Sequence, residues 1–388
     1  MAFTQLSAHL VELVAQDLYR TRQIIDSAPG VHVQIAGRQL INFSSNDYLG
    51  LANHPQVKHA FKAAVDDFGV GSGAAHLVCG HHRVHHELEN DLAEFTGRER
   101  AVLFSTGFMA NLGIMNALLT RKDCVFEDRL NHASLLDGGL ASGARFKRYR
   151  HADSHDLKRL MLTPSTANTT LVVSDGVFSM DGDCAPLPQL VALTTHHQAW
   201  LMIDDAHGFG VLGEQGGGLV AQHGFSQQEV PILMATFGKA LGTFGAFVAG
   251  SDALIETIIQ RARSYIYTTA LPPALAAATR VSLQLMINDS WRRQKLQALI
   301  AHFRQGAEQL GLSVAPSQSA IQPIMIGSNQ RAVELSAALR EQGFWVSAIR
   351  PPTVPTNTAR LRVTFSALHE LAEVEALLAA LDNCRVNA

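Results

Sequence analysis

Short apolar runs alternate with longer stretches of helical periodicity over most of the chain, from about residue 50 to residue 285. The runs are Ala101–Ser105, Thr170–Ser174, Leu201–Asp204, Ile232–Thr236 and Ala246–Ala249. Their length and composition are typical of buried strands. The alternation of such strands with helices predicts an α/β fold, in which a mostly parallel central sheet carries helices on both faces.

The two ends of the chain show other patterns. An amphipathic N-terminal helix is predicted by apolar residues near helical spacing, namely Leu6, Leu10, Val14 and Leu18. Ordinary packing would bury the apolar face of this helix. Residues 31–43 predict short strands. Runs at Ile321–Ile326 and Leu361–Thr364 predict a smaller α+β domain, in which Pro323 confines the first run to a sheet edge or to a late start. We therefore expect an N-terminal helix with short strands, a large domain and a C-terminal α+β domain, over residues 1–50, 51–285 and 286–388.

Composition narrows the class of protein. The 388 residues include 34 acidic and 31 basic side chains, so nothing indicates a nucleic-acid or membrane-surface partner. No apolar run is long enough to cross a bilayer, and Glu12 and Asp17 interrupt any signal-peptide pattern. The four widely spaced cysteines form neither a disulfide pattern nor a metal-ligand pair. We expect a soluble metabolic enzyme in a reducing cytoplasm.

Lys239 is the most informative candidate for chemistry. It stands in a glycine-rich turn between two predicted strands, where Gly238 and Gly242 allow a tight turn and a close approach to a ligand. An apolar setting disfavours the charged amine and leaves a nucleophile near neutral pH. Such a lysine is typical of a Schiff-base former for a carbonyl cofactor, above all pyridoxal phosphate. Taken alone, the motif also fits a solvated surface lysine.

A second candidate site follows the predicted strand at residues 201–204. That strand ends in Asp204 and Asp205, and His207 comes three residues after Asp204. Functional groups of open α/β sheets collect at the carboxyl ends of strands. Asp204 can keep a pyridine nitrogen protonated, and His207 can hydrogen-bond the phenolic oxygen of the same ring. The alternative is a capping aspartate followed by a polar histidine with ordinary partners.

Phosphate binding needs backbone donors at the start of a helix. Residues 104–111 follow a predicted strand and open a helix, so the amides near Gly107 and Phe108 can face an anion. Ser179 and Thr236 lie at strand ends and can add hydroxyl donors. Without further information, both also fit capping hydroxyls in turns.

Six segments occur in the order of, and resemble, the motifs of the α-oxoamine synthases: residues 42–50, 131–134, 176–183, 204–208, 236–239 and 351–355. The resemblance extends from about residue 10 to the C-terminus. It implies a pyridoxal-phosphate enzyme of the aspartate-aminotransferase fold (fold type I). It also implies that Lys239 holds pyridoxal 5'-phosphate, that residues 104–111 form the phosphate cup, and that His132 stacks on the cofactor ring.

Within this family, residues 348–355 and 358–362 most resemble the members that condense L-alanine with a pimeloyl thioester, with loss of carbon dioxide, in biotin biosynthesis. The sequence leaves open whether coenzyme A or acyl carrier protein carries the pimeloyl group. The resemblance implies a homodimer with shared active sites. Three other interpretations remain: a sister synthase that uses glycine or serine, an aminotransferase that releases no carbon dioxide, and a non-catalytic scaffold.

The resemblance also implies roles toward the substrates. Lys239 would act as general base after releasing the cofactor. Arg20 and Thr353 would lie near the acyl substrate. Arg362 is the candidate for binding the amino-acid carboxylate, with help from Asn46, because a guanidinium matches a carboxylate with two parallel hydrogen bonds.

Some positions depart from common patterns. Residues 71–76 begin like a dinucleotide-binding fingerprint but lack its third glycine and a clear preceding strand, which argues against nicotinamide binding. The resemblance implies a glycine-rich loop here that reaches the neighbouring subunit's site, and Ala74 and Ala75 make it less glycine-rich than usual. Gly217 stands where relatives often carry arginine, and Asn357 stands where glycine is common.

A histidine-rich stretch raises the question of a metal. It contains His81, His82, His85 and His86, with Glu87 and Glu89 nearby. Two pairs have the i, i+4 spacing of zinc sites on helices. A metalloprotease helix needs a glutamate directly after the first histidine of the pair. Here His82 follows His81, and Arg83 follows His82. We therefore expect a solvated helix face and no metal site.

Overall fold

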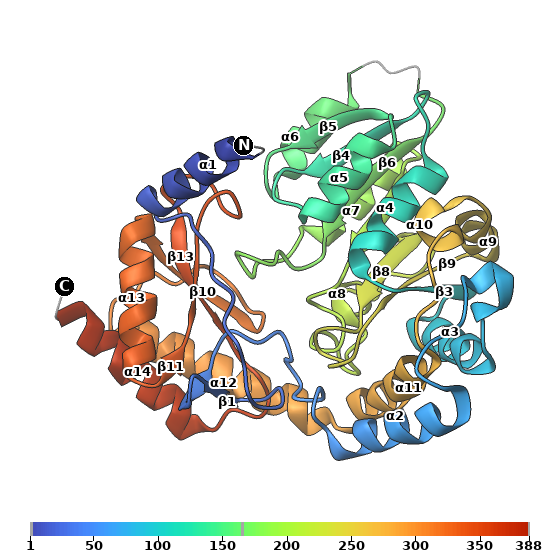
Figure 1. The fold of residues 1–388 in the computed structure, drawn as a ribbon. Coiled ribbons are helices and arrows are strands. Elements are labelled where there is room, and N and C mark those ends of the chain that lie inside the picture. Colours follow the sequence, from blue (N-terminus) through green and yellow to red (C-terminus); the bar gives the residue numbers. More distant parts are fainter. Residues whose placement is uncertain (1–2, 164–166, 387–388) are drawn as a thin grey trace. The chain divides into compact units, whose positions relative to one another are not determined.

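The computed structural model describes residues 3–163 and 167–386, which form two compact units (Figure 1). The smaller unit contains Met1–Gly50, Met180–Asp183 and Gln294–Ala388, and the larger unit contains Leu51–Ser179 and Cys184–Arg293. The N-terminal segment thus belongs to the same unit as the C-terminal region. Residues 286–293 belong to the larger unit, whereas the sequence assigned them to the C-terminal domain.

The larger unit is built on a seven-stranded sheet of order β3-β9-β8-β7-β6-β4-β5. The strands are β3 (Arg100–Phe104), β4 (Cys124–Asp128), β5 (Arg145–Tyr149), β6 (Thr170–Asp175), β7 (Trp200–Asp204), β8 (Ile232–Thr236) and β9 (Ala246–Gly250). Only β9 runs against its neighbours β3 and β8; the pairs among β4 to β8 are parallel. This mostly parallel sheet confirms the predicted fold class, although β4 and β5 were not among the predicted strands.

Helices pack on both faces of this sheet. The helices of the larger unit are α2 (Pro55–Phe68), α3 (Arg83–Thr96), α4 (Gly107–Leu118), α5 (Ala133–Ala141), α6 (Ser154–Met161), α7 (Leu187–His196), α8 (Gly218–Gln222), α9 (Asp252–Arg261), α10 (Arg263–Ile266) and α11 (Pro273–Asn288), with a π-helical turn η1 (His76–Gly80). One buried cluster joins Val173 and Met202 to α4 and α9, and another joins Val172 and Ile203 to α7 and α8. Since successive side chains of a strand point to opposite faces, each strand supplies both clusters.

The smaller unit has two three-stranded sheets, of order β1-β2-β11 and β10-β13-β12. The strands are β1 (His32–Ile35), β2 (Arg38–Asn42), β10 (Ile321–Gly327), β11 (Phe344–Trp345), β12 (Ser347–Ile349) and β13 (Ala359–Thr364), and the helices are α1 (Thr4–Ala15), α12 (Ser290–Gln309, of which residues 294–309 lie in this unit), α13 (Asn329–Glu341) and α14 (Leu371–Val386). β10 is an edge strand and carries Pro323, as predicted. An edge position tolerates proline because one side of the strand needs no ladder donor.

The N-terminal helix forms as predicted but ends at Ala15, so Leu18 lies outside it. Its apolar side chains are not buried in the single chain: Leu6 is 57% exposed and Val14 is 59% exposed. The expected burial of this face by ordinary packing is therefore absent among the described residues. No helix in residues 3–163 and 167–386 is both long and apolar enough to span a membrane.

Candidate active site

Lys239 lies in the connection between β8 and β9 and is half-buried. The amide of Gly242 donates to the carbonyl of Lys239 at 2.9 Å, which closes a turn around the lysine. Gly242 has a φ of +64°, and a Cβ there would lie 2.3 Å from the amide nitrogen of Ala52. Glycine is therefore required at this position by both conformation and space. Gly238 has no such restriction, since the nearest atom to its Cβ position is 3.7 Å away.

Asp204 ends β7 and is 4% exposed. Its carboxylate accepts hydrogen bonds from Nδ2 of Asn111 at 2.8 Å and from the amide of Ala206 at 3.1 Å. Asn111 lies on α4, is 1% exposed and also donates to Oγ of Ser134 at 2.8 Å. No pattern in the sequence points to Asn111, because its partner Asp204 is 93 residues away in the chain. A buried carboxylate held in this way keeps a fixed orientation.

His132 is the N-cap residue of α5, and its Nδ1 lies 2.7 Å from Oγ of Ser134. Burial lowers its pKa; the negative charge of Asp204 opposes this shift and the positive charge of Lys239 adds to it. The three predicted residues therefore influence one another electrostatically within one unit. A pKa below 6.5 makes this imidazole neutral at pH 7.

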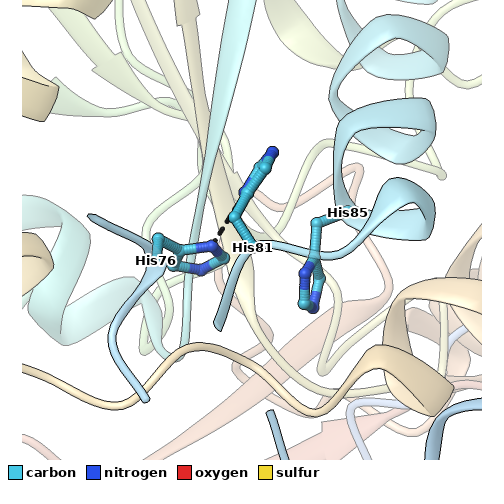
Figure 2. A group of neighbouring side chains, drawn as sticks. All are labelled: His76, His81 and His85. Carbon is cyan, nitrogen blue, oxygen red and sulfur yellow. Dashed lines mark hydrogen bonds between the residues drawn. The ribbon is translucent and has the colours of Figure 1, made fainter. Parts of the chain in front are cut away.

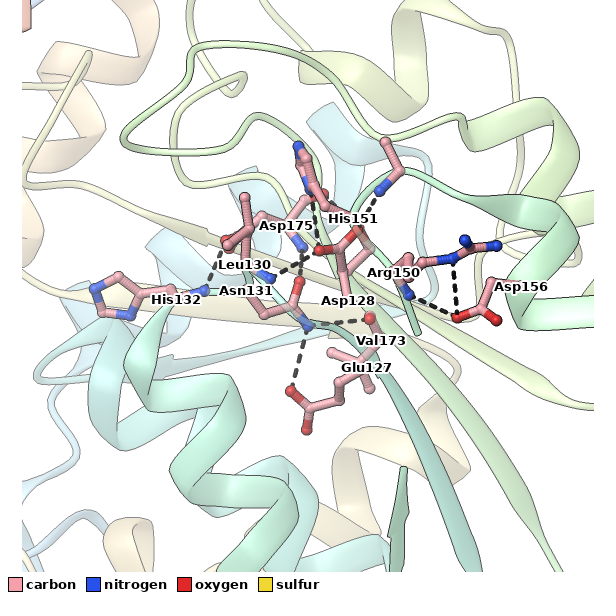
Figure 3. Close-up of polar contacts among 12 residues, drawn as sticks. Glu127, Asp128, Leu130, Asn131, His132, Arg150, His151, Asp156, Val173 and Asp175 are labelled. Atoms are coloured by element: carbon pink, nitrogen blue, oxygen red, sulfur yellow. Dashed lines mark hydrogen bonds and ion pairs between the residues drawn. The ribbon is translucent and has the colours of Figure 1, made fainter. Parts of the chain in front are cut away.

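A chain of polar contacts supports His132 from behind (Figure 3). Its amide donates to Oδ2 of Asp175 at 2.8 Å, and the amide of Asp175 donates to Oδ1 of Asn131 at 3.0 Å. Nδ2 of Asn131 then donates to Oε2 of Glu127 at 3.3 Å. Burial and the charge of Asp204 raise the pKa of Asp175 well above its ordinary value. Asp175 was not among the predicted site residues, although it ends β6 as Asp204 ends β7.

The first turn of α4 offers the expected anion site. Its N-cap is Thr106, whose hydroxyl accepts from the amide of Met109 at 3.1 Å. The amides of Gly107 and Phe108 belong to the first turn, where no intrahelical acceptor is available. A Cβ on Gly107 would lie 3.9 Å from Cβ of Thr236, so the end of β8 lies beside this turn. Backbone amides with a helix dipole behind them are the usual donors to a phosphate.

The remaining cofactor candidates have different surroundings. Thr236 directs its hydroxyl to the carbonyl of Gly245 at 2.8 Å, so it must turn to donate to an anion. His207 is 7% exposed and lies in the turn after β7. Ser179 is half-buried and follows β6 at the boundary of the larger unit.

Asp205 has a structural environment quite unlike that of Asp204. Its Oδ2 accepts from the amide of Leu219 at 2.6 Å, and burial raises its pKa to about 8. A Cβ on Gly176, Gly208 or Gly218 would lie 2.7, 2.1 or 2.0 Å from its oxygens. Only glycine at these three positions leaves room for the buried carboxyl group of Asp205. A side chain at Gly217 would meet Cβ of Ala221 at 2.7 Å, so the arginine of relatives would need a shift in this turn.

The predicted substrate residues form two pairs in the smaller unit. Arg362 lies on β13, is 7% exposed, and donates through both terminal nitrogens to Oδ1 of Asn46 at 3.3 and 3.2 Å. Arg20 donates to Oγ1 of Thr353 at 3.1 Å on the surface. Asn357 has a φ of +62°, which explains why glycine is common there.

The histidine-rich stretch is only partly a solvated helix face, so that prediction was wrong for His85. This residue is fully buried in α3, and burial lowers its pKa to about 4. His82 is the N-cap residue of α3, whereas His81 and His86 are exposed. Residues 71–76 follow α2 rather than a strand, which agrees with the argument against nicotinamide binding.

Comparisons with known proteins agree with the motifs. A family model described as aminotransferase class I and II matches residues 38–381. The 8-amino-7-oxononanoate synthase of Methylococcus capsulatus is 59% identical over 381 residues, which is 98% of each chain. That of Pseudomonas fluorescens is 59% identical over 379 residues, covering 98% of this chain and 96% of its own length.

Solved structures extend this agreement to the fold. A serine palmitoyltransferase from S. paucimobilis, solved with PLP and myriocin bound, has a TM-score of 0.94 at 29% identity and covers 99% of this chain and 98% of its own. The 8-amino-7-oxononanoate synthase from Francisella tularensis has a TM-score of 0.79 at 32% identity, covering 90% of this chain and 98% of its own. The chain therefore belongs to the aminotransferase class I and II family and, within it, to the α-oxoamine synthases.

Proposed function

We propose that the chain binds pyridoxal 5'-phosphate and condenses L-alanine with a pimeloyl thioester, giving 8-amino-7-oxononanoate, carbon dioxide and the free thiol. The relatives named 8-amino-7-oxononanoate synthase, identical at 59% of positions over nearly the whole chain, support this activity. The observation that carries the proposal is the hydrogen-bonded link from Asp204 through Asn111 and Ser134 to His132, with the charge of Lys239 close enough to lower the pKa of His132.

The donor set of the larger unit fits this cofactor. Lys239 offers a primary amine for the aldehyde carbon, and Asp204 offers a buried carboxylate fixed by Asn111. The free amides of the first turn of α4 suit the phosphate. The imidazole of His132 is neutral at pH 7, so it can stack on the cofactor ring without adding a charge beside it. We assign His207, Ser179 and Thr236 to hydrogen bonds with the cofactor.

When bound, the cofactor supplies an electron sink for the carbanion formed at the amino acid's α-carbon. Asp204 holds a proton at the ring nitrogen. The amine of Lys239, once released from the aldehyde carbon, removes the α-proton as general base and later returns a proton. His132 forms one wall of the ring site and keeps water from that face.

Residues of the smaller unit bind the substrates in this proposal. Arg362 pairs with the carboxylate of L-alanine, and Asn46, already bonded to Arg362, holds the guanidinium in place. Arg20 and Thr353 contact the acyl chain, where a guanidinium suits the free carboxylate of a pimeloyl group. The carrier is coenzyme A or acyl carrier protein, and both are to be assayed.

We also propose that the enzyme works as a cytoplasmic homodimer with shared active sites. Large exposed apolar side chains on the larger unit support this proposal, because a second copy of the chain would bury them. Val70 is 83% exposed, Val78 is 77% exposed and Tyr267 is 71% exposed. Val78 lies on η1, which contacts α10, the helix directly before Tyr267. Exposed apolar patches are typical of association surfaces. Sedimentation of the purified protein tests the stoichiometry.

The experiment compares wild type with Lys239→Ala, using L-alanine with pimeloyl-coenzyme A and then with pimeloyl-acyl carrier protein. Wild type should yield 8-amino-7-oxononanoate by mass spectrometry together with carbon dioxide, and the variant should lose at least about 100-fold in rate. Glycine and serine, paired with other acyl thioesters, serve as comparison substrates. A keto-acid product without carbon dioxide would identify an aminotransferase, and a preference for serine with a long acyl chain would identify a sister synthase.

A further inference from the structure

A histidine cluster on the larger unit lies outside the residues assigned to the reaction. It consists of His76, His81, His82, His85 and His86, at η1 and the start of α3. Within residues 3–163 and 167–386, two groups bring three ligand atoms within 4.8 Å of one another: His76, His81 and His85 form one, and His81, His86 and Glu89 form the other. The groups share His81, so the hydrogen bonds of the other members decide between them.

The first group, drawn in Figure 2, has no lone pair to offer at His85, because both ring nitrogens of His85 have hydrogen-bond partners. Nδ1 of His85 accepts from the amide of His82 at 3.0 Å, and Nε2 lies 2.7 Å from the carbonyl of Leu271. Since Nδ1 accepts, Nε2 carries the proton and donates to the carbonyl. A metal ion there would have to break a cap of α3 and a buried hydrogen bond. The first group is therefore a structural arrangement.

In the second group, the two histidines are exposed in the single chain and the glutamate is already oriented; burial of the Glu89 carboxyl group raises its pKa to about 7. His81 and His86 are exposed, and His86 and Glu89 are three residues apart on α3, so they share one face of the helix. Oε1 of Glu89 accepts from the amide of Leu103 at 3.1 Å, and Oε2 lies 3.9 Å from Nε2 of His81. A tetrahedral ion with bonds of about 2.0–2.2 Å holds its donors roughly 3.3–3.6 Å apart. The exposed histidines need only a small adjustment to reach this spacing.

His76 provides the outer partner that metal-binding histidines usually have. The Nδ1 atoms of His76 and His81 are 3.0 Å apart (Figure 2). His76 is 8% exposed and stacks on Tyr265 with ring centroids 5.1 Å apart, which holds its Nδ1 in place. When His81 donates its Nδ1 proton to His76, the lone pair on Nε2 faces Glu89. This tautomer is the one that a ligand histidine needs.

The backbone before His81 is also fixed. A Cβ on Gly80 would lie 2.1 Å from the carbonyl oxygen of Ala74, so the chain passes too close there for any other residue. The amide of Gly80 donates to the carbonyl of Ala75 at 3.0 Å. His81 is thus presented from a rigid turn toward a helix that carries the other two donors.

We propose that His81, His86 and Glu89 form a binding site for a divalent transition-metal ion, with zinc as the ion that best suits two imidazoles and a carboxylate. Three protein ligands leave a fourth position for water or an external ligand. The bound ion would join the segment after η1 to the first turns of α3. This site does not depend on the proposed reaction.

Zinc titration of the untagged holoenzyme by calorimetry, after treatment with a chelator, tests the proposal. Wild type should bind one zinc ion per chain. His81→Gln, His86→Gln and Glu89→Gln should each weaken zinc binding by at least about 10-fold, since even an outer-shell partner contributes that much. His59→Gln, which changes an exposed histidine on α2, is the matched control and should leave the affinity unchanged. Equal weakening in His59→Gln, or no saturable zinc binding by wild type, would overturn the proposal.

A second measurement separates the two groups and does not depend on affinity alone. Cobalt(II) should give the visible absorption of a low-coordinate site with nitrogen and oxygen donors in wild type, and this absorption should be lost in His86→Gln. If His86→Gln keeps it and His85→Gln loses it, the ion lies in the first group and the proposal is wrong. Thermal unfolding of each metal-free variant shows that the fold is retained, as expected for exposed His81 and His86.

Discussion

Asn111 connects α4 to the carboxylate at the end of β7, and its removal tests how that carboxylate is held. Nδ2 of Asn111 lies 2.8 Å from both Oδ2 of Asp204 and Oγ of Ser134. Asn111 is 1% exposed and Asp204 is 4% exposed, so water has little access to replace the lost donor. We predict that Asn111→Ala lowers both the stability of the fold and the rate of condensation.

The expected losses of stability and of rate follow from the hydrogen bond between Asn111 and Asp204 that the variant removes. A hydrogen bond to a charged group contributes about 1.5–3 kcal/mol. Asp204 keeps the amide of Ala206 at 3.1 Å, so part of its orientation survives. We expect the free energy of unfolding to fall by about 2 kcal/mol. If the same interaction orients Asp204 toward the cofactor, kcat falls by roughly 10- to 100-fold, because each 1.36 kcal/mol corresponds to a factor of ten.

The assay is the steady-state rate with L-alanine, combined with urea unfolding of the same preparations. Asn116→Ala is the matched control, because Asn116 lies on the same helix and donates to the carbonyl of Leu112 at 2.7 Å within it. The control should change kcat little. The double variant Asn111→Ala with Asp204→Asn should lose less than the sum of the single losses. Equal kcat values for the two single alanine variants, or strictly additive losses in the double variant, would refute the reasoning.

Three further predictions concern packing, pH and substrate binding. Gly218 has a φ of +87°, and a Cβ there would lie 2.0 Å from Oδ2 of Asp205, whereas Gly224 has a φ of +69° and open space around its Cβ position. In urea unfolding, Gly218→Ala should lower the free energy of unfolding by about 1–3 kcal/mol more than Gly224→Ala does. Burial lowers the pKa of His369 from 6.5 to about 4, so the unfolded chain binds its proton first and stability falls as pH drops from 6.5 toward 4. His369→Gln should reduce this slope by about 1.4 kcal/mol per pH unit, and an unchanged slope would contradict the assignment. Arg362→Lys should raise KM for L-alanine by about 10-fold or more while KM for the pimeloyl thioester stays constant, because an ammonium cannot form the paired hydrogen bonds; an equal rise in both values would argue against the role.

Strands β3, β6, β7 and β8 could be predicted because each is an apolar run that ends in polar residues, whereas β4, which leads to His132, has an apolar run of only three residues and was not predicted. β8 has the predicted bounds, Ile232–Thr236, and its end leads directly to Lys239. β5 could not be predicted in this way. Its sequence, Arg145–Tyr149, carries three basic residues, since it pairs only with β4 at the sheet edge and needs no continuous apolar run.

Contacts between distant segments set the limit on predicting the site. The contact of Asn111 with Asp204 depends on how α4 packs on the sheet, and no spacing in the sequence encodes that packing. For His85 a signal did exist. Val84, Leu88 and Leu92 repeat every four residues and define the buried face of α3, and His85 lies three residues before Leu88 on that face. The histidines and charges around them concealed this periodicity.

Asp204 and Asp205 show why adjacent acids at a strand end differ in function. Asp204 has the same parity along β7 as Met202, whose face packs against α4, so its carboxylate meets Asn111. Asp205 has the parity of Ile203, whose face packs against α8, so its carboxyl group meets the amide of Leu219. The alternation of strand side chains thus separates the two acids. Three glycines then enclose Asp205, which leaves Asp204 as the carboxylate available to a cofactor. The sequence Asp-Asp alone cannot distinguish the two acids. The glycines at 176, 208 and 218 distinguish them, because only glycine at these positions leaves room for the carboxyl group of Asp205.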